Sequence, residues 1–480
     1  MTNSNNKSRK KTKQSIKQPP YKKTRKKQHD VVLHQILGNE NNLQQINQQF
    51  SRLKNQLSIT FNTTKKLKPK INAITVPHAG FVYSGILGLF TINEILEANK
   101  TAKTITILWF RHNKETQQEH SMINVEKLIK LLNSTIKIKT IEITKLTRLT
   151  DLKEQLKPPF LVSTDFAHYN YGTPARNLIE AWENDKLFLT MKNKNTLSLV
   201  ASNKKYPCGS QPLRIMKEWS SKKGNVLHLF GYSNSKYKEK WWLKDNKQFD
   251  GVTYASVGSI KKSHNWFSPL NSKMLAYSHL GWIKDCLHSN NNNTFADNNG
   301  LFWSPLKSMK GSCFLTVYRE NKDTYSCFGS WEKQSSSKQD DSYWEKQSSS
   351  LLHNIIDATK TVKRVSWGSN KPVNKHVLNT HLKGKYSLSL SLIEPQNKWK
   401  LVLDANNPSI KRNRGYVYCH IKTKKIGMTF LPSVWDSISN KKEFFEKLKQ
   451  KHEGNYPKNP NHPNEWGLYC YESISWNLQL

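Results

Sequence analysis

The sequence predicts two units of different fold class: an α/β N-terminal domain with a central sheet flanked by helices, and an α+β C-terminal domain. Two observations support this. Apolar, strand-like runs alternate with helical patterns as far as about residue 260, which is typical of a largely parallel sheet covered by helices. Beyond a polar stretch at 290–300, alternating strand patterns are followed by one capped helix. A chain of 480 residues is long enough for two or three domains.

The individual elements follow from hydrophobic periodicity. In the first half we expect strands at 71–77, 104–110, 160–166 and 226–233, and helices at 41–57, 84–99, 175–191 and 213–219. In the second half we expect strands at 311–320, 385–393 and 415–423, and a helix at 439–452. The heptapeptide WEKQSSS occurs at 331–337 and again at 344–350. This repeat predicts a duplicated low-complexity surface insertion at about 331–350.

The net charge of +41 is concentrated in part at the N-terminus, where residues 1–28 hold eleven Lys or Arg and no acid. We expect residues 1–30 to form a basic disordered tail. Such a tail suits nuclear targeting or contact with RNA or another phosphate-rich partner, and a simple solvated segment is the alternative. No apolar run predicts a membrane span or a signal peptide. We therefore expect an intracellular protein, cytoplasmic or nuclear, without a membrane partner.

The spacing and context of the six cysteines argue against two common kinds of site, a structural zinc site and a disulfide framework. No two of them form a C-x-x-C pair, which argues against a structural zinc site. A disulfide framework is not expected in so long a chain without a secretory signal. The cysteines are therefore expected to be reduced thiols.

Polar side chains that bind metals follow several of the predicted strands of the first half. They are His78 after 71–77, His112 after 104–110, Asp165 and His168 after 160–162, and Cys208 before the helix at 213–219. Because the carboxyl ends of parallel strands meet at one edge of a sheet, these groups are expected to converge. Histidines with an anionic ligand suit iron, copper or zinc. An ordinary loop residue is the alternative for each histidine taken singly.

Five segments of the first half resemble the successive motifs of the Memo family in order and spacing, over roughly 42–262. They are VPHAGFVYSG, STDFAHYNYG, YPCGSQPLRIM, LFGYSNS and DGVTYASVGSI. The resemblance implies the fold of the class III extradiol dioxygenases, which are non-haem iron enzymes. It also implies that His78, His112 and Cys208 are metal ligands and that His168, with Asp165 behind it, is an acid/base residue. The family's second motif is usually Gly-Pro-Ser-His-His, but the present chain has LWFRHN, which keeps His112 and adds Arg111.

The second half, over 263–480, resembles an AMMECR-type domain, most closely in the TFLPSVW segment and the helix after it. The hallmark Leu-Arg-Gly-Cys-Ile-Gly of that family is here TYSCFG, which keeps Cys327 and Gly329 as a remnant. We expect Cys327 to be a buried strand cysteine; a reactive or ligand-binding thiol is the alternative. Together the two resemblances imply a fusion of AmmeMemoRadiSam system proteins, with a separate radical-SAM protein as partner.

These observations lead to two hypotheses about function. The first is a metal-dependent redox enzyme, dioxygenase-like or part of a modification system, that uses iron or copper held by His78, His112 and Cys208. The second is a catalytically degenerate Memo/AMMECR-type scaffold that binds an anionic peptide or nucleic acid. In the second hypothesis Arg111 is an anion contact.

Overall fold

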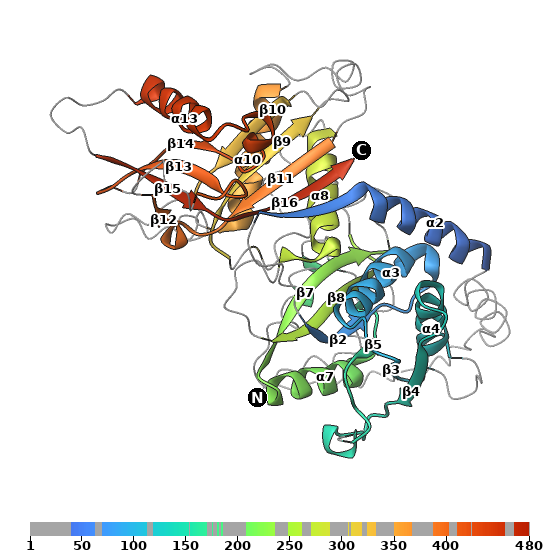
Figure 1. Ribbon diagram of the computed structural model, residues 1–480. Coiled ribbons are helices and arrows are strands. Elements are labelled where there is room, and N and C mark those ends of the chain that lie inside the picture. Colours follow the sequence, from blue (N-terminus) through green and yellow to red (C-terminus); the bar gives the residue numbers. More distant parts are fainter. Residues whose placement is uncertain are drawn as a thin grey trace, which may run out of the picture.

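The structure is a computed structural model, and it describes most of both halves of the chain (Figure 1). The described residues are 40–62, 70–112, 119–152, 154–169, 175, 180–181, 184–185, 208–235, 248–261, 270–288, 306, 309–318, 324–332, 350–366, 387–402, 410–423, 425–456 and 465–479. The expected basic tail, most of the expected helix at 175–191 and nearly all of the expected insertion at 331–350 lie outside these residues.

The strands of the first unit form a seven-stranded mixed sheet among the described residues. They are β2 (Ile71–Val76), β3 (Thr104–Trp109), β4 (Lys137–Glu142), β5 (Phe160–Ser163), β6 (Ala167–His168), β7 (Asn225–Asn234) and β8 (Val252–Lys261). Four neighbours, in the order β4-β3-β5-β2, run parallel. Strand β8 is antiparallel to β2, β6 and β7. The expected parallel sheet is thus confirmed for one half of this sheet, and an antiparallel extension completes it.

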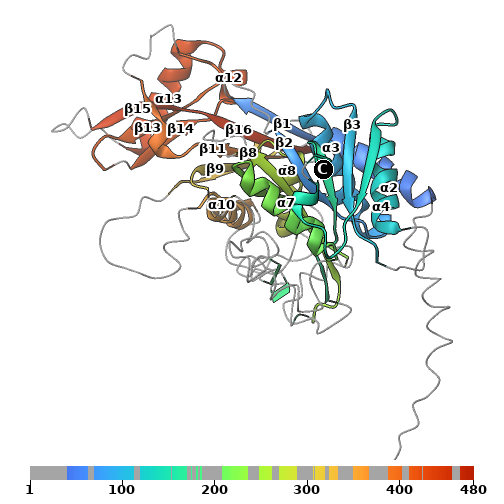
Figure 2. The ribbon, with the colours of Figure 1, turned by 90° about the horizontal axis from the view of Figure 1, so that it is seen from below.

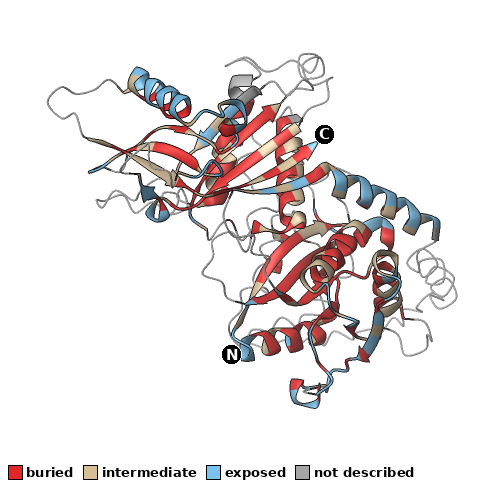
Figure 3. Ribbon diagram, in the orientation of Figure 1, coloured by how far each residue is buried: buried red, intermediate tan, exposed pale blue. Residues whose placement is uncertain are grey.

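Helices cover both faces of this sheet, because successive strand residues are apolar on both sides. On one face, Ile74 and Leu161 pack with α3 (Phe81–Ala98) and α4 (His120–Leu132). On the other face, Ala73 and Val162 pack with α7 (Ser210–Lys222). Figure 2 shows α4 and α7 on opposite sides of the strands. The outermost helix of the first face is α2 (Glu40–Gln56), which buries Ile46 and Phe50 and exposes most of its other residues (Figure 3).

Helix α3 is long and apolar enough, by length and composition alone, to cross a membrane. However, 61% of its 18 residues are buried inside the structure. It packs against β2, α2 and α4. Its apolar character is therefore that of a core helix, as the sequence predicts.

Within the described part of the chain, the second unit is built on a five-stranded antiparallel sheet in the order β1-β16-β11-β9-β10. Its strands are β1 (Leu57–Asn62), β9 (Ser312–Tyr318), β10 (Thr324–Ser330), β11 (Ser387–Ile393) and β16 (Ser473–Gln479). Helices α8 (Lys273–His288) and α10 (Leu351–Ser366) contribute to its core around Trp476, which is fully buried. Strand β1 falls within the range expected for the first unit, yet it pairs with β16 of the second.

A smaller antiparallel sheet extends the second unit, in the order β12-β15-β13-β14. It consists of β12 (Lys400–Leu401), β13 (Gly415–His420), β14 (Ile426–Phe430) and β15 (Trp466–Tyr471). The short helix α12 (Val434–Ser437) and α13 (Lys441–Asn455) cover it through Trp435 and Phe444, whose rings stack 3.6 Å apart. The Asn440 side chain caps α13 by accepting a hydrogen bond from the Glu443 N–H. The mixed α/β and α+β layout expected from the sequence is therefore present.

Candidate metal centre

Three strand ends meet at one edge of the first sheet. Strand β5 lies between β2 and β3, and all three run in the same direction. The segments that follow them are consequently neighbours: His78 lies two residues after β2, His112 three residues after β3, and Asp165 two residues after β5. Cys208 comes from a distant part of the chain, in the turn that starts α7. The structure thus brings these sequence-predicted residues together.

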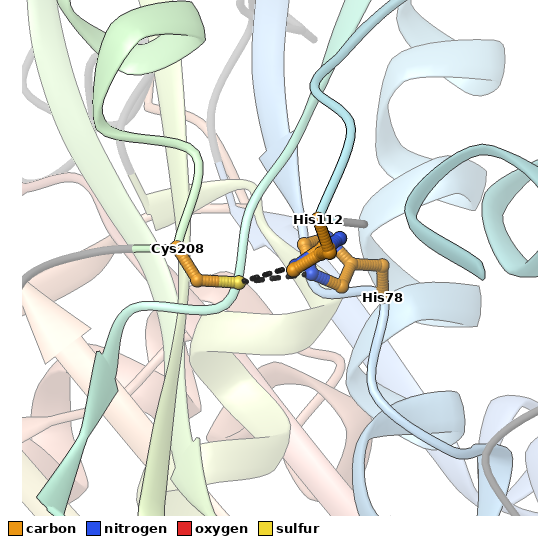
Figure 4. A group of neighbouring side chains, drawn as sticks. All are labelled: His78, His112 and Cys208. Atoms are coloured by element: carbon orange, nitrogen blue, oxygen red, sulfur yellow. Dashed lines mark hydrogen bonds between the residues drawn. The ribbon is translucent and has the colours of Figure 1, made fainter. Parts of the chain in front are cut away.

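His78, His112 and Cys208 point toward one another (Figure 4). The Nε2 atom of His78 lies 3.1 Å from Sγ of Cys208, and Nε2 of His112 lies at the same distance from that sulfur. These ligand atoms all lie within 4.8 Å of one another, so the three residues could hold a metal ion. An ion bound at about 2.0 Å to nitrogen and 2.3 Å to sulfur in tetrahedral geometry spans roughly 3.5 Å between them. A small outward movement of the side chains would therefore admit one.

Asp165 contacts the segment that carries His78 as well as facing His168, whereas the sequence indicates only the second contact. Its Oδ1 accepts hydrogen bonds from the backbone N–H groups of His78 (2.9 Å) and Ala79 (3.1 Å). Its Oδ2 lies 3.6 Å from Nε2 of His78 and 3.9 Å from Nε2 of His168. Asp165 therefore supports the segment that carries His78 as well as facing His168. Asp165, His168 and Cys208 form a second group of ligand atoms within 4.8 Å of one another, so Cys208 belongs to both groups.

Burial controls the charges of this cluster. Desolvation lowers the pKa of His78 well below its ordinary value, and the positive potential of His112 adds to the effect. Burial also lowers the pKa of His168, while Asp165 opposes that change. Burial raises the pKa of Cys208 well above its usual range, and the negative potential of Asp165 adds to it. A neutral imidazole is the form that binds a metal, whereas the thiol must give up its proton on binding.

Two residues of the site, Glu119 and His120, were missed by the sequence reasoning. Glu119 is buried, and its Oε1 lies 2.6 Å from Nδ1 of His112. Its Oε2 accepts a hydrogen bond from the His112 backbone N–H (3.0 Å). The ring of His120 stacks on that of His112 at 4.2 Å, and its Nδ1 lies 3.3 Å from Oε1 of Glu119. His112, Glu119 and His120 are a third group that could hold a metal ion. The only sequence signal for these two residues is their position at the start of an amphipathic helix, with Glu119 as the cap and His120 as the first helical residue.

The expected anion contact, Arg111, binds a neighbouring carboxylate. Its Nε and Nη2 donate to the two carboxylate oxygens of Glu142 at 3.1 and 2.9 Å. This two-point hydrogen bond raises the pKa of Arg111, although desolvation opposes it. The guanidinium also lies over the Trp109 ring, 5.2 Å from its centroid. Its charge is thus balanced by Glu142 at the end of β4, which reduces the electrostatic repulsion that an unpaired cation would exert on a nearby metal ion.

The two remnant positions of the second unit lie far from this centre in the fold, on the edge strand β10. Cys327 is exposed, so the expectation that it is buried is wrong, although its placement in a strand is confirmed. Neighbouring groups crowd the thiol enough for desolvation to raise its pKa, while a hydrogen bond donated by Thr316 opposes that change. A Cβ at Gly329 would lie 2.5 Å from the Phe314 ring, so packing accounts for this glycine.

Comparison with known proteins provides no assignment. No protein-family model matches the chain, and no curated protein matches it. Among solved structures, an uncharacterized protein PH0010 from Pyrococcus horikoshii is similar at 14% sequence identity and a TM-score of 0.28. The match covers 40% of the present chain and 89% of that protein. At this TM-score it carries no conclusion about fold or function.

Proposed function

We propose that this chain is a Memo-like metal-binding protein in which His78, His112 and Cys208 hold iron or copper. The observation that supports the proposal is the convergence of two histidine Nε2 atoms on one cysteine sulfur, at 3.1 Å each. Imidazole and thiolate ligands suit copper, iron and zinc and do not suit magnesium or calcium. The Memo resemblance implies that the same three residues are metal ligands, so the motif argument and the geometry support a single site.

The activity we propose is redox chemistry of the dioxygenase-like kind. A bound iron or copper ion would supply the electron-transfer or oxygen-activating step. The chain's own residues have separate roles. Asp165 fixes the His78 segment through two backbone hydrogen bonds. His168 is the residue we assign to proton transfer, because its imidazole lies beside Asp165 at the same edge of the sheet and its lowered pKa favours the neutral form, which can accept a proton.

The alternative is a scaffold that keeps the fold without the chemistry and binds an anionic peptide or nucleic acid. For an anion bound in the pocket, this alternative assigns Arg111 as the contact, and the pairing of Arg111 with Glu142 argues against that role. An accessory AMMECR-type role for the second unit, a radical-SAM partner and an RNA contact through the basic tail remain parts of the proposal that rest on sequence resemblance and charge.

Metal analysis of the purified protein distinguishes the two functions. If His78, His112 and Cys208 hold a metal, we expect near-stoichiometric iron or copper after anaerobic reconstitution, and we expect this metal to be lost in His78→Ala and in Cys208→Ala. Arg111→Ala is the matched control, because it changes a charged residue next to His112 that is no ligand; it should keep the metal. Protein that takes up neither iron nor copper, while remaining folded, would overturn the proposal.

A further inference from the structure

One short segment, Glu119 and the first turns of α4, contributes hydrogen-bond partners to both candidate histidine ligands. Its contacts with the two rings are on the Nδ1 side, away from the Nε2 atoms that face Cys208. Glu119 contacts His112 through both carboxylate oxygens. Ser121 contacts His78 indirectly: its carbonyl accepts the hydroxyl hydrogen of Ser163, and the Ser163 oxygen lies 2.8 Å from Nδ1 of His78. Asn124, one turn further on, donates from Nδ2 to the His78 carbonyl at 2.8 Å.

These contacts determine where the hydrogen of each imidazole lies. A serine hydroxyl has one hydrogen, and that of Ser163 is donated to the Ser121 carbonyl. The Ser163 oxygen therefore accepts from His78, whose hydrogen must be on Nδ1. A carboxylate only accepts, so the 2.6 Å contact of Glu119 also requires a hydrogen on Nδ1 of His112. In the neutral form of each ring, Nε2 is then left with a bare lone pair.

The two bare lone pairs face one sulfur atom. Each Nε2 lies 3.1 Å from Sγ of Cys208, whose thiol has one hydrogen to donate. The thiol can satisfy one imidazole at a time, and the other lone pair faces the sulfur without a hydrogen between them. A metal cation can bind both nitrogen lone pairs and the sulfur at once. In doing so it takes the place of the Cys208 thiol proton, which is released.

We propose that Glu119 and the Ser163–Ser121 pair are positioning residues that hold His112 and His78 in the Nδ1–H form, so that both Nε2 atoms are ready to bind a metal. The inference rests on the proposed metal centre and goes beyond it, because it assigns metal affinity to the start of α4 rather than to the ligands alone. Outer hydrogen bonds of this kind change metal affinity by about 10–100-fold in known sites.

Metal titration of four variants provides the first test, with Co²⁺ as a spectroscopic probe that gives a thiolate band when Cys208 binds it. Glu119→Ala removes the acceptor and should weaken binding by about 10–100-fold. Glu119→Gln keeps an oxygen that accepts from Nδ1–H, so it should recover part of the affinity. Ser163→Ala should weaken binding through His78. Glu126→Gln is the matched control: it makes the same change at another acidic residue of α4 that forms no hydrogen bond or ion pair with either histidine, and it should bind like the wild type.

The hydrogen positions can be read directly in metal-free protein by nitrogen NMR of ¹⁵N-histidine-labelled samples, with His78→Gln and His112→Gln for assignment. The wild type should show the Nδ1–H form at both residues, and Glu119→Ala should shift His112 toward the Nε2–H form. Unchanged hydrogen positions and unchanged Co²⁺ affinity in a folded Glu119→Ala protein would overturn the inference. If the wild type binds no metal, the proposed function fails, while the NMR spectra still decide whether Glu119 sets the form of His112.

Discussion

The backbone N–H of His78 donates a hydrogen bond to Oδ1 of Asp165 over 2.9 Å, although the two residues are 87 positions apart in the chain. The contact is possible because β2 and β5 are parallel neighbours, so that the segments following them leave the same edge of the sheet. A second N–H, from Ala79, donates to the same oxygen. The carboxylate thus fixes the backbone of one candidate ligand while its other oxygen faces the ring nitrogens of His78 and His168.

We expect Asp165→Asn to separate these two roles. The asparagine oxygen can still accept both N–H hydrogen bonds, so the thermal unfolding midpoint should stay within a few degrees of the wild type. Its NH₂ group would, however, face Nε2 of His78 where Oδ2 now lies, 3.6 Å away. This donor competes with a metal for the same lone pair, and we expect metal affinity to fall about tenfold or more. Isothermal titration with Co²⁺ or Cu⁺ measures the change. Wild-type affinity in this variant would contradict the assigned role.

The turn that presents Cys208 depends on Gly209. This residue has φ +94°, and a Cβ there would lie 2.9 Å from the Ser163 carbonyl oxygen and from Cβ of Thr164. Gly209→Ala therefore combines a left-handed backbone with a steric clash and should reduce the free energy of unfolding by about 2 kcal/mol or more. It should also weaken metal binding, because Cys208 is the adjacent residue.

Gly224, at the end of α7, is the matched control for this substitution. It also has a left-handed φ, +65°, but nothing lies within 4 Å of the position that its Cβ would take. Gly224→Ala should cost only about 1 kcal/mol for the backbone conformation and leave metal binding unchanged. Denaturant unfolding and metal titration of both variants test the comparison. Equal effects of the two substitutions on metal affinity would contradict a specific role for the Cys208 turn.

A buried carboxyl group near the sheet makes stability depend on pH. Asp185 accepts hydrogen bonds from the hydroxyls of Tyr169 (3.0 Å) and Tyr232 (2.5 Å), and burial raises its pKa from 3.8 to about 7. Because the folded pKa is above the unfolded value, the folded state binds the proton more tightly between pH 4 and pH 7. Raising the pH through this window therefore destabilises the fold, by at most about 1.4 kcal/mol per pH unit.

Asp185→Asn removes this titration and serves as the reference. The free energy of unfolding of the wild type, measured relative to the variant in urea, should decrease from pH 4 to about pH 7 and then level off. Tyr169 and Tyr232 are present in both proteins, so the difference between their free energies of unfolding reports the titration of the Asp185 carboxyl group. A difference that is constant over this range, or that rises with pH, would contradict the assignment.

The sequence predicts the parts of the fold that hydrophobic periodicity determines locally. The expected strands at 71–77 and 104–110 and the helix at 84–99 correspond to β2, β3 and α3. The pairing of β1 with β16 could not be predicted, since it joins residues more than 400 positions apart. Local periodicity identifies a strand but does not indicate which other strand it pairs with. The antiparallel direction of β8 could not be predicted either, because a buried strand has the same apolar run of residues whichever way it points in the sheet.

The same division holds for the candidate site. The expected convergence of His78, His112 and Cys208 could be predicted because each adjoins the end of an element. Glu119 could not be, because an acidic residue before a helix is ordinarily a solvent-exposed capping residue. Only the three-dimensional course of the chain shows that its carboxylate is buried against His112. The pairing of Arg111 with Glu142 likewise depends on the register of β3 with β4.

The most direct test of the central claim is X-ray absorption spectroscopy of the iron- or copper-reconstituted protein, compared with Cys208→Ser. If His78, His112 and Cys208 hold the ion, we expect one sulfur and two imidazole nitrogens at about 2.0–2.4 Å from it, with the sulfur shell absent in the variant. A bound ion surrounded only by oxygen and nitrogen in the wild type, or a spectrum identical in the two proteins, would contradict it.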